Sequence, residues 1–140
     1  MATSDRLGFL GGSDISAAMG LSHWKSPLAL WAEKTGKLPM ENDQNAEAKE
    51  IGTELEEYVC KKFEQRTGKK LRRDVQDRIH PQYPYLRCHL DRLILNEDSI
   101  FEAKTTSAWN AKRWDGELIP DEYVLQVNWG LGMTNRALGY

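Results

Sequence analysis

Three charged residues near the middle of the chain, Asp91, Glu102 and Lys104, are of the types that hydrolyse phosphodiesters at a metal ion. Glu102 and Lys104 lie two residues apart in the apolar stretch SIFEAKTT, and side chains at that spacing share one face of a β-strand. Two neighbouring carboxylates repel each other unless a cation such as Mg²⁺ joins them, and a lysine beside them could orient a water or stabilise a phosphorane. The alternative from spacing alone is a surface salt-bridge cluster, which adds little stability.

A β-hairpin must bring these charges together. We expect strands over residues 85–95 and 100–106, joined by the four-residue turn Asn96–Ser99. This turn would pair Asp91 with Lys104, so that both carboxylates and the lysine project from one face.

A long helix, expected over residues 47–67 and ending at Gly68, supplies another acid. The apolar stripe expected to face the core consists of Ile51, Leu55, Tyr58, Val59 and Phe63. Glu54 and Glu57 fall on the polar side, whereas Glu56 falls at the edge of the buried arc. A glutamate at that boundary needs a partner, which makes Glu56 a candidate acid either in a metal site or directly behind its ligands; chance placement is the alternative.

The remaining elements give a mixed α/β order. A short helix is expected to start at Ser13 as its N-cap and to end at Gly20. A second helix is expected between the cap Ser26 and the terminator Gly36. The last predicted helix covers residues 119–134, with a proline in its first turn. The polar segment 40–50 is expected to be a loop or the lead-in to the long helix.

Composition limits the class of protein. The 140 residues suit a single domain, and 40% apolar residues with five Trp favour a globular fold. Cys60 and Cys88 belong to no CxxC motif and predict reduced thiols in a cytoplasmic protein. No run is apolar enough for a membrane span or a signal peptide. The net charge of −2 excludes a broad cationic surface, and the one dense basic cluster, Lys69–Arg73, predicts a solvated turn or a local DNA patch.

Several motifs carry a family resemblance. Asp91 followed by Glu102-x-Lys104 resembles the PD-(D/E)xK nuclease core, with HLD where that pattern has a proline. The blocks RLGFLGGSDISAAMGLSHWKSPLALWAEKTGK, GTELEE and YVLQV, in this order, resemble the YqaJ-like viral recombinase family, which is lambda-exonuclease-like. The family's glutamate in GTELEE matches Glu56, and its tyrosine-x-x-glutamine matches Tyr123 and Gln126. The resemblance implies a three-layer α/β core in which helices flank a mixed central sheet.

The resemblance also implies an activity: Mg²⁺-dependent digestion of duplex DNA from a 5′ end in phage-type recombination. The metal ligands that it implies are Asp91, Glu102 and the backbone carbonyl of Ala103, around one or two Mg²⁺ ions for which Mn²⁺ can substitute. Glu56 would complete this metal site, either directly or through water or a second ion. Lys104 would position the attacking water, and Gln126 would orient Lys104 or that water. The alternative for Gln126 is a polar residue on a solvated helix face.

A 5′-phosphate pocket is implied near the N-terminus. Gly11 and Gly12 permit close backbone approach, and free N–H groups at a helix start attract anions. In the family, an arginine and a serine with the spacing of Arg6 and Ser13 bind the 5′-phosphate, and a serine two residues before the metal aspartate assists them. His89 stands at that last position, a departure that leaves phosphate preference open; an ordinary capped helix is the alternative for Ser13.

The whole-chain expectations follow from the same resemblance. Family members continue beyond the glutamine helix, so residues 1–140 are expected to be a single nuclease domain shortened at its C-terminal end, where the next strand should begin. The implied partners are duplex DNA, a single-strand annealing protein and further copies of the chain, in the cytoplasm of a bacterium or phage-infected host. The alternatives are an endonuclease or structure-specific repair nuclease on the same core, and a non-catalytic DNA-end or protein-binding module.

Overall fold

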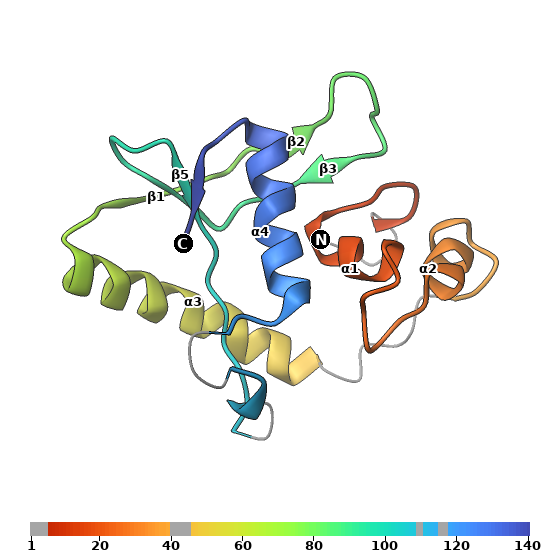
Figure 1. Cartoon of the computed structure of the whole chain (residues 1–140), viewed down its shortest axis with the longest axis horizontal. Coiled ribbons are helices and arrows are strands. Elements are labelled where there is room, and N and C mark those ends of the chain that lie inside the picture. The colour runs from red at the N-terminus through yellow and green to blue at the C-terminus, as the bar shows by residue number, and fades with distance from the viewer. Residues whose placement is uncertain (1–5, 40–45, 109–110, 115–117) are drawn as a thin grey trace.

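A computed structural model describes residues 6–39, 46–108, 111–114 and 118–140 (Figure 1). Its helical elements are η2 (Gly12–Asp14), α1 (Ile15–Ala18), α2 (Pro27–Lys34), α3 (Ala46–Thr67), η3 (Ala111–Trp114) and α4 (Asp121–Thr134). Its strands are β1 (Leu71–Arg73), β2 (Arg78–Ile79), β3 (Arg87–Cys88), β4 (Arg92–Ile94), β5 (Ser99–Phe101) and β6 (Leu138–Gly139).

The central sheet is mixed. Its strand order is β1-β4-β5-β6, with antiparallel pairing except between β5 and β6, which run parallel. The parallel pair needs a crossover, and α4 provides it. Strands β2 and β3 form a separate antiparallel ribbon.

Alternate residues of β4 and β5 face different helices and form two core layers. Leu93 and Ile100 pack with residues of α4, including Val127 and Leu131. The next residue of each strand packs on α3 instead, in a cluster that contains Ile94, Phe101, Cys60 and Phe63. The sheet therefore lies between α3 and α4, which confirms the three-layer α/β fold with a mixed sheet.

The predicted hairpin register was wrong by two residues. Leu93 pairs with Ile100, so the loop is residues 95–98 instead of Asn96–Ser99. Asn96 adopts a left-handed conformation with φ 63°, and Ser99 is a buried strand residue. A shift of two residues preserves the facing of every side chain, so both carboxylates stay on one face, and Glu102 replaces Lys104 as the residue nearest to Asp91 across the ladder.

The strands are shorter than predicted. The segment 85–95 contains two strands, β3 and β4, with a break between them, and β5 ends at Phe101. Beyond that point the amide of Glu102 donates to the carbonyl of Tyr140 over 2.9 Å. The β6 strand therefore occupies the position where the sequence predicted that a further strand should begin.

The long helix forms as predicted, but its predicted apolar stripe was wrong in part. Ile51, Leu55 and Tyr58 are exposed, whereas Cys60 is buried and Val59 and Phe63 pack on the sheet. The helix begins at Ala46, so the described part of segment 40–50 is a helix lead-in; residues 40–45 lie outside the described part of the chain. Helix α3 presents a narrow seam to the sheet and leaves apolar side chains on its outer side.

The caps and terminating glycines of the shorter helices are as predicted, with one exception. Ser26 caps α2 by accepting the Ala29 N–H over 3.1 Å, and Gly36 has a positive φ. The first helix is capped differently, because the N-terminal turn begins at Gly12 and the Asp14 carboxylate accepts the Gly11 N–H over 3.0 Å. Ser13 therefore lies inside this turn and is not its N-cap.

The predictions for the basic cluster and for the two cysteines can be compared with the structure. Part of the basic cluster Lys69–Arg73 is the edge strand β1 and not a turn, and Lys69 pairs with Glu97. Cys60 and Cys88 are both free thiols and both buried. Within the described ranges, no helix combines the length and apolar character that crossing a membrane requires.

Candidate active site

Most of the predicted site residues line one cavity of about 270 Å³. The hairpin contributes Asp91, Glu102 and Lys104, and helix α4 contributes Gln126. The N-terminal turn contributes Arg6 and Ser13, and His89 lies between β3 and β4. The remaining lining residues are Phe9, Gly11, Gly12, Asp77, Arg87, Cys88, Leu90, Ile100 and Trp129. Segments far apart in sequence therefore converge where strands β3 and β4 meet the N-terminal turn and α4.

Glu102 is the centre of the polar contacts. Its Oε1 accepts a hydrogen bond from the Lys104 ammonium over 2.5 Å and another from the Gln126 amide. The Glu102 side chain is only 8% exposed. Burial is the main cause that raises the pKa of Glu102, and the negative charge of Asp91 adds to it. The sheet and α4 together fix three of the predicted catalytic side chains.

Asp91 is held by the strand that carries Glu102. Its Oδ2 accepts the backbone N–H of Ala103 over 2.8 Å. Burial raises the pKa of Asp91, although the Ala103 N–H opposes this shift by stabilising the carboxylate. Two carboxyl groups with raised pKa values in one cavity mark a functional-site candidate.

Glu56 is not among the residues that line this cavity. It lies on the α3 side, where its Oε1 accepts from the Arg92 guanidinium over 2.5 Å. Its charge nevertheless raises the pKa values of both Asp91 and Glu102, so it lies within electrostatic range of the pair. Sequence reasoning placed Glu56 correctly at the edge of the buried arc but did not find Arg92, its partner.

Two of the three predicted phosphate residues, Arg6 and Ser13, contact each other in the cavity. Arg6 Nη2 donates to Ser13 Oγ over 3.3 Å. A Cβ on Gly12 would lie 3.1 Å from Cγ of Gln126, so the close approach that this glycine permits is to helix α4. The N-terminal turn is thereby packed directly against the residue that contacts Glu102.

Several residues of the site carry no motif in the sequence. Arg87 lies at the cavity with its guanidinium 4.7 Å from the Phe9 ring centre, and its backbone carbonyl accepts from the Trp129 indole over 2.9 Å. The Tyr123 ring stacks on Trp114 with centres 5.1 Å apart, and the Lys104 ammonium lies 5.6 Å from its centre. These contacts join residues that are far apart in sequence, so only the folded structure reveals them. Tyr123 alone could be found from the sequence, as part of the YVLQV block.

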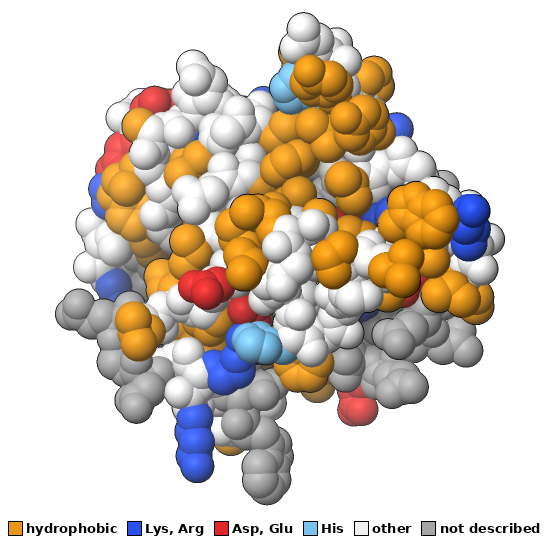
Figure 2. All heavy atoms as spheres, turned by 45° about the vertical axis from the view of Figure 1, so that its right-hand side comes forward, with side chains coloured by type: hydrophobic (Ala, Val, Ile, Leu, Met, Phe, Trp, Pro, Cys, Tyr) orange, Lys and Arg blue, Asp and Glu red, His pale blue; other side chains and the backbone are white. Residues whose placement is uncertain are grey.

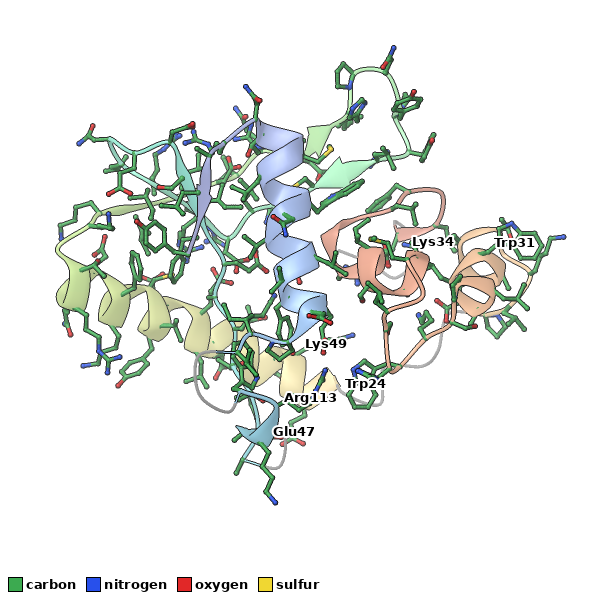
Figure 3. All side chains as sticks on the ribbon, in the orientation of Figure 1. Trp24, Trp31, Lys34, Glu47, Lys49 and Arg113 are labelled. Atoms are coloured by element: carbon green, nitrogen blue, oxygen red, sulfur yellow. The ribbon has the colours of Figure 1, made fainter. Side chains whose placement is uncertain are left out.

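The short η3 segment packs beside Tyr123. Arg113 of η3 forms an ion pair of 2.7 Å with Glu122 of α4, and Figure 3 shows Arg113 near the first turn of that helix. This ion pair and the neighbouring Trp114–Tyr123 stack tie η3 to α4 close to the candidate lysine.

The donor chemistry of the cavity fits a hard divalent cation, because Asp91 and Glu102 supply carboxylate oxygens from one buried face. Among the residues that the structure describes, however, no three His, Cys, Asp or Glu side chains are grouped to hold a metal ion. Glu56, the third predicted acid, is engaged by Arg92 instead. The two hairpin carboxylates are therefore the candidate ligands that the fold brings together.

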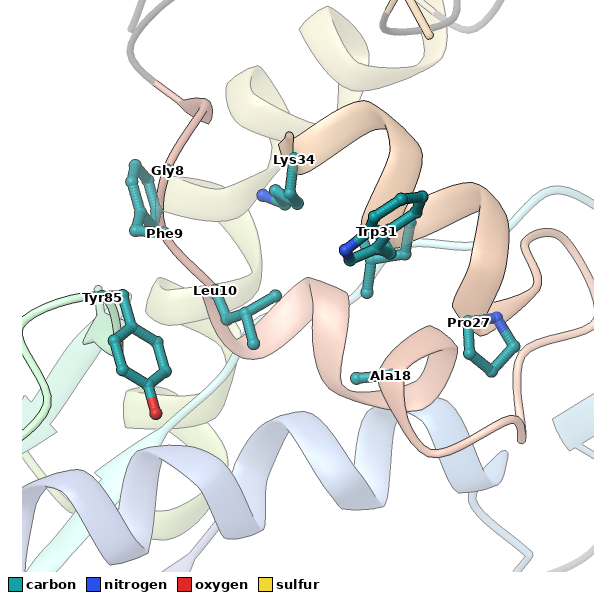
Figure 4. Close-up of a pocket in the computed structure, with 9 residues that line it drawn as sticks. Gly8, Phe9, Leu10, Ala18, Pro27, Trp31, Lys34 and Tyr85 are labelled. Carbon is teal, nitrogen blue, oxygen red and sulfur yellow. The ribbon is translucent and has the colours of Figure 1, made fainter. Parts of the chain in front are cut away.

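A second cavity, of about 360 Å³, lies beside the first and is almost entirely apolar (Figure 4). Phe9 lines both cavities. Lys34 extends from α2 toward the segment that carries Phe9, and its ammonium forms an ion pair of 2.8 Å with Asp14. Trp31, which is half exposed, closes the far wall. Hydrophobic side chains also cover much of the face that carries α2 and the β2–β3 ribbon (Figure 2).

Comparisons with known proteins identify the family of this chain. The profile of the YqaJ-like viral recombinase domain matches residues 3–137. The chain is 46% identical over 124 residues to the uncharacterized protein YqaJ of Bacillus subtilis, covering 89% of this chain and 39% of that protein. This chain thus spans about two fifths of the length of its curated relative.

The fold is also similar to a solved structure. The crystal structure of an alkaline exonuclease, LHK-Exo, from Laribacter hongkongensis superposes with a TM-score of 0.71 at 19% identity, covering 98% of this chain and 71% of that one. A second structure of LHK-Exo, in complex with dAMP, matches with the same values. At this identity the likeness concerns the fold, whereas the domain profile covers nearly the whole sequence. The chain belongs to the YqaJ-like viral recombinase domain family.

Proposed function

We propose that this protein is a Mg²⁺-dependent deoxyribonuclease that removes nucleotides from the 5′ ends of duplex DNA. The observation that carries the proposal is the convergence of Asp91, Glu102, Lys104 and Gln126 in one cavity with Arg6 and Ser13. The family and the alkaline exonuclease with the same fold support a nuclease. A complex of that exonuclease with dAMP supports nucleotide binding in this type of fold.

One group of residues would bind the metal ion and another would bind the terminal phosphate. Asp91, Glu102 and the carbonyl of Ala103 would hold Mg²⁺, with Glu56 as an outer acid. When bound, the ion would supply Lewis-acid polarisation of the scissile phosphate. Arg6 and Ser13 would bind the terminal phosphate, and His89 lies where it could assist them. These contacts fix the register of the strand end relative to the two hairpin carboxylates.

Lys104 would act on the attacking water. Its ammonium is held by Glu102 Oε1 and lies near the Tyr123 ring, so its position is set before substrate arrives. Gln126 shares the same carboxylate oxygen and thereby keeps the Glu102 side chain oriented. A cation fixed at this position orients the water and stabilises the charge that develops on the phosphorane.

The first prediction tests this proposal with linear duplex DNA carrying either a 5′-phosphate or a 5′-hydroxyl, in Mg²⁺ or in EDTA. We expect Mg²⁺-dependent release of nucleotides from the 5′-terminated strand by the wild type. The Lys104→Ala variant should be slower by at least about 100-fold, the usual effect of losing a group that acts on the transferred proton or water. Preference for the 5′-phosphate should weaken in Arg6→Ala, which keeps the metal site intact.

Other outcomes assign a different function. Cutting of closed circular DNA would indicate an endonuclease or structure-specific repair nuclease. DNA binding by a folded wild type without any cleavage would indicate a non-catalytic DNA-end module. Binding to a single-strand annealing protein and self-association stay predictions of the family resemblance.

A further inference from the structure

Arg92 lies at the junction between the candidate site and helix α3. It directly follows Asp91 in β4 and is only 7% exposed. Its side chain points to the α3 side of the sheet, since neighbouring strand residues face opposite layers. Arg92 is thus a buried cation behind the face that carries the two hairpin carboxylates.

The guanidinium makes three hydrogen bonds that link the helix to the strand. Nη1 donates to Glu56 Oε1 over 2.5 Å and to the backbone carbonyl of Asp91 over 2.7 Å. Nη2 donates to Glu57 Oε2 over 3.1 Å. The Glu57 side chain is 63% exposed and that of Glu56 is 24% exposed, so the Glu56 bond is the better shielded of the two.

These bonds explain why Glu56 does not line the cavity beside Asp91 and Glu102. Glu56 lies close enough to raise the pKa values of Asp91 and Glu102, yet its carboxylate is turned to Arg92. A carboxylate paired with a fixed guanidinium is also a poorer ligand for a second cation, because the two cations repel each other.

We propose that Arg92 is a positioning residue that holds Glu56 out of direct contact with the metal, so that Glu56 acts on the site only through water. This inference rests on the proposed metal-dependent function and adds a residue that sets how many carboxylates bind the ion. Neutral replacement of Arg92 frees Glu56 to join the two hairpin carboxylates as a third ligand. A third carboxylate tightens metal binding but removes a water-organising group, so affinity and turnover change in opposite directions.

The test measures Mg²⁺ affinity calorimetrically on the whole chain without DNA, and cleavage separately. Arg92→Met keeps the length of the buried stem and removes the charge. We expect it to bind Mg²⁺ about tenfold more tightly, the scale on which residues around a metal site act, while cleavage falls. Adding Glu56→Gln to Arg92→Met should return the affinity to that of the wild type. Glu57→Gln, which removes only the exposed arm, should leave both quantities unchanged.

A second variant keeps the inference testable if Arg92→Met does not fold. Glu56→Gln alone should change Mg²⁺ affinity by less than about threefold, since a carboxylate that acts through water contributes little direct binding energy. A loss of tenfold or more in this variant would show direct ligation and overturn the inference. A gain in Arg92→Met that persists in the double variant would assign the effect to charge repulsion alone and also overturn it.

Failure of the proposed function gives a different result from failure of this inference. If the wild type binds no Mg²⁺, both are wrong. If the wild type binds Mg²⁺ and cleaves DNA while the affinities of wild type and folded Arg92→Met agree, only the role of Arg92 is wrong.

Discussion

Burial makes the ionised Asp91–Glu102 pair unfavourable in the absence of a cation. Both pKa values are raised above their ordinary range, mainly by desolvation, so the folded protein binds protons more readily than the unfolded chain. A raised carboxyl pKa contributes stability at acid pH that is lost as pH rises through the folded-state pKa. The site therefore gains its negative charge at the expense of stability near neutral pH.

A neutral isostere should reverse this effect. Asp91→Asn keeps an oxygen that can accept the Ala103 N–H and removes the charge, so we expect it to stabilise the protein in EDTA at pH 7–8 by about 1 kcal/mol. The gain should shrink as pH falls toward the range where the Asp91 carboxyl is protonated. Denaturant unfolding at several pH values measures it, and an Asp91→Asn variant that is less stable than wild type at pH 8 would contradict the prediction.

The sequence predicted which individual residues belong to the site better than it predicted their interaction partners. Glu102-x-Lys104 and the conspicuous blocks predicted Asp91, Glu102, Lys104 and Gln126, which the fold brings to one cavity. Helical periodicity placed Glu56 at a boundary, but periodicity describes only which side of a helix is buried. It carries no information on the strand residue opposite, and the partner Arg92 therefore required the packed structure.

Helix α4 packs tightly on the core at Gly130. A Cβ on Gly130 would lie 2.8 Å from Ile100 Cδ1 and 3.0 Å from Leu90 Cδ2, whereas one on Gly132 would meet nothing within 4 Å. Helix α4 also carries Gln126, one turn earlier. The packing distance at Gly130 therefore sets how far the glutamine reaches into the site.

The two glycines give a matched pair of variants. Gly130→Ala should destabilise the protein by about 1–3 kcal/mol through overpacking, and it should lower cleavage by displacing Gln126. Gly132→Ala should stabilise it by up to about 1 kcal/mol, because alanine is the better helix former and has room here. Thermal unfolding and cleavage rates, measured for both variants, check the direction of each change. Equal effects of the two substitutions would contradict the prediction, because they would show that α4 can shift without loss of stability or cleavage.

Element types were easier to predict than registers. Caps and glycine terminators identified α2 and the end of α3, since Ser26 and Gly68 act locally. The hairpin register failed because the left-handed residue Asn96 allows a loop one residue earlier, and Ser99 is small enough to be buried in the strand. The exposed residues Ile51, Leu55 and Tyr58 were misassigned because α3 meets the sheet along a narrower seam than their spacing suggests.

The whole molecule carries a net charge of −2, and its basic side chains near the candidate site are few. Arg6, Arg87 and Lys104 line the cavity, and Lys34 lies close by. Contacts with DNA phosphates should therefore be few and local, which limits how steeply DNA affinity falls as the salt concentration rises.

This charge distribution predicts the salt dependence of DNA binding. A plot of log affinity against log salt concentration should have a slope no steeper than about −4, because each phosphate contact contributes about −0.9. Arg6→Ala should make the slope shallower, whereas Arg72→Ala, on the exposed edge strand β1, should leave it unchanged. Fluorescence anisotropy in EDTA, which prevents cleavage, measures both; a loss of slope in Arg72→Ala would identify the basic cluster as a DNA patch.

The bond between the Glu102 amide and the Tyr140 carbonyl has a consequence for how the protein is made. Synthesis proceeds from the N-terminus, so the β4–β5 hairpin leaves the ribosome well before α4 and β6 exist. Until β6 docks in parallel beside β5, the amide of Glu102 lacks its acceptor. Until α4 packs on the sheet, Gln126 cannot contact the Glu102 carboxylate. A nascent chain would thus expose both acids before the site is complete, and the proposed nuclease activity would require β6 to have docked beside β5.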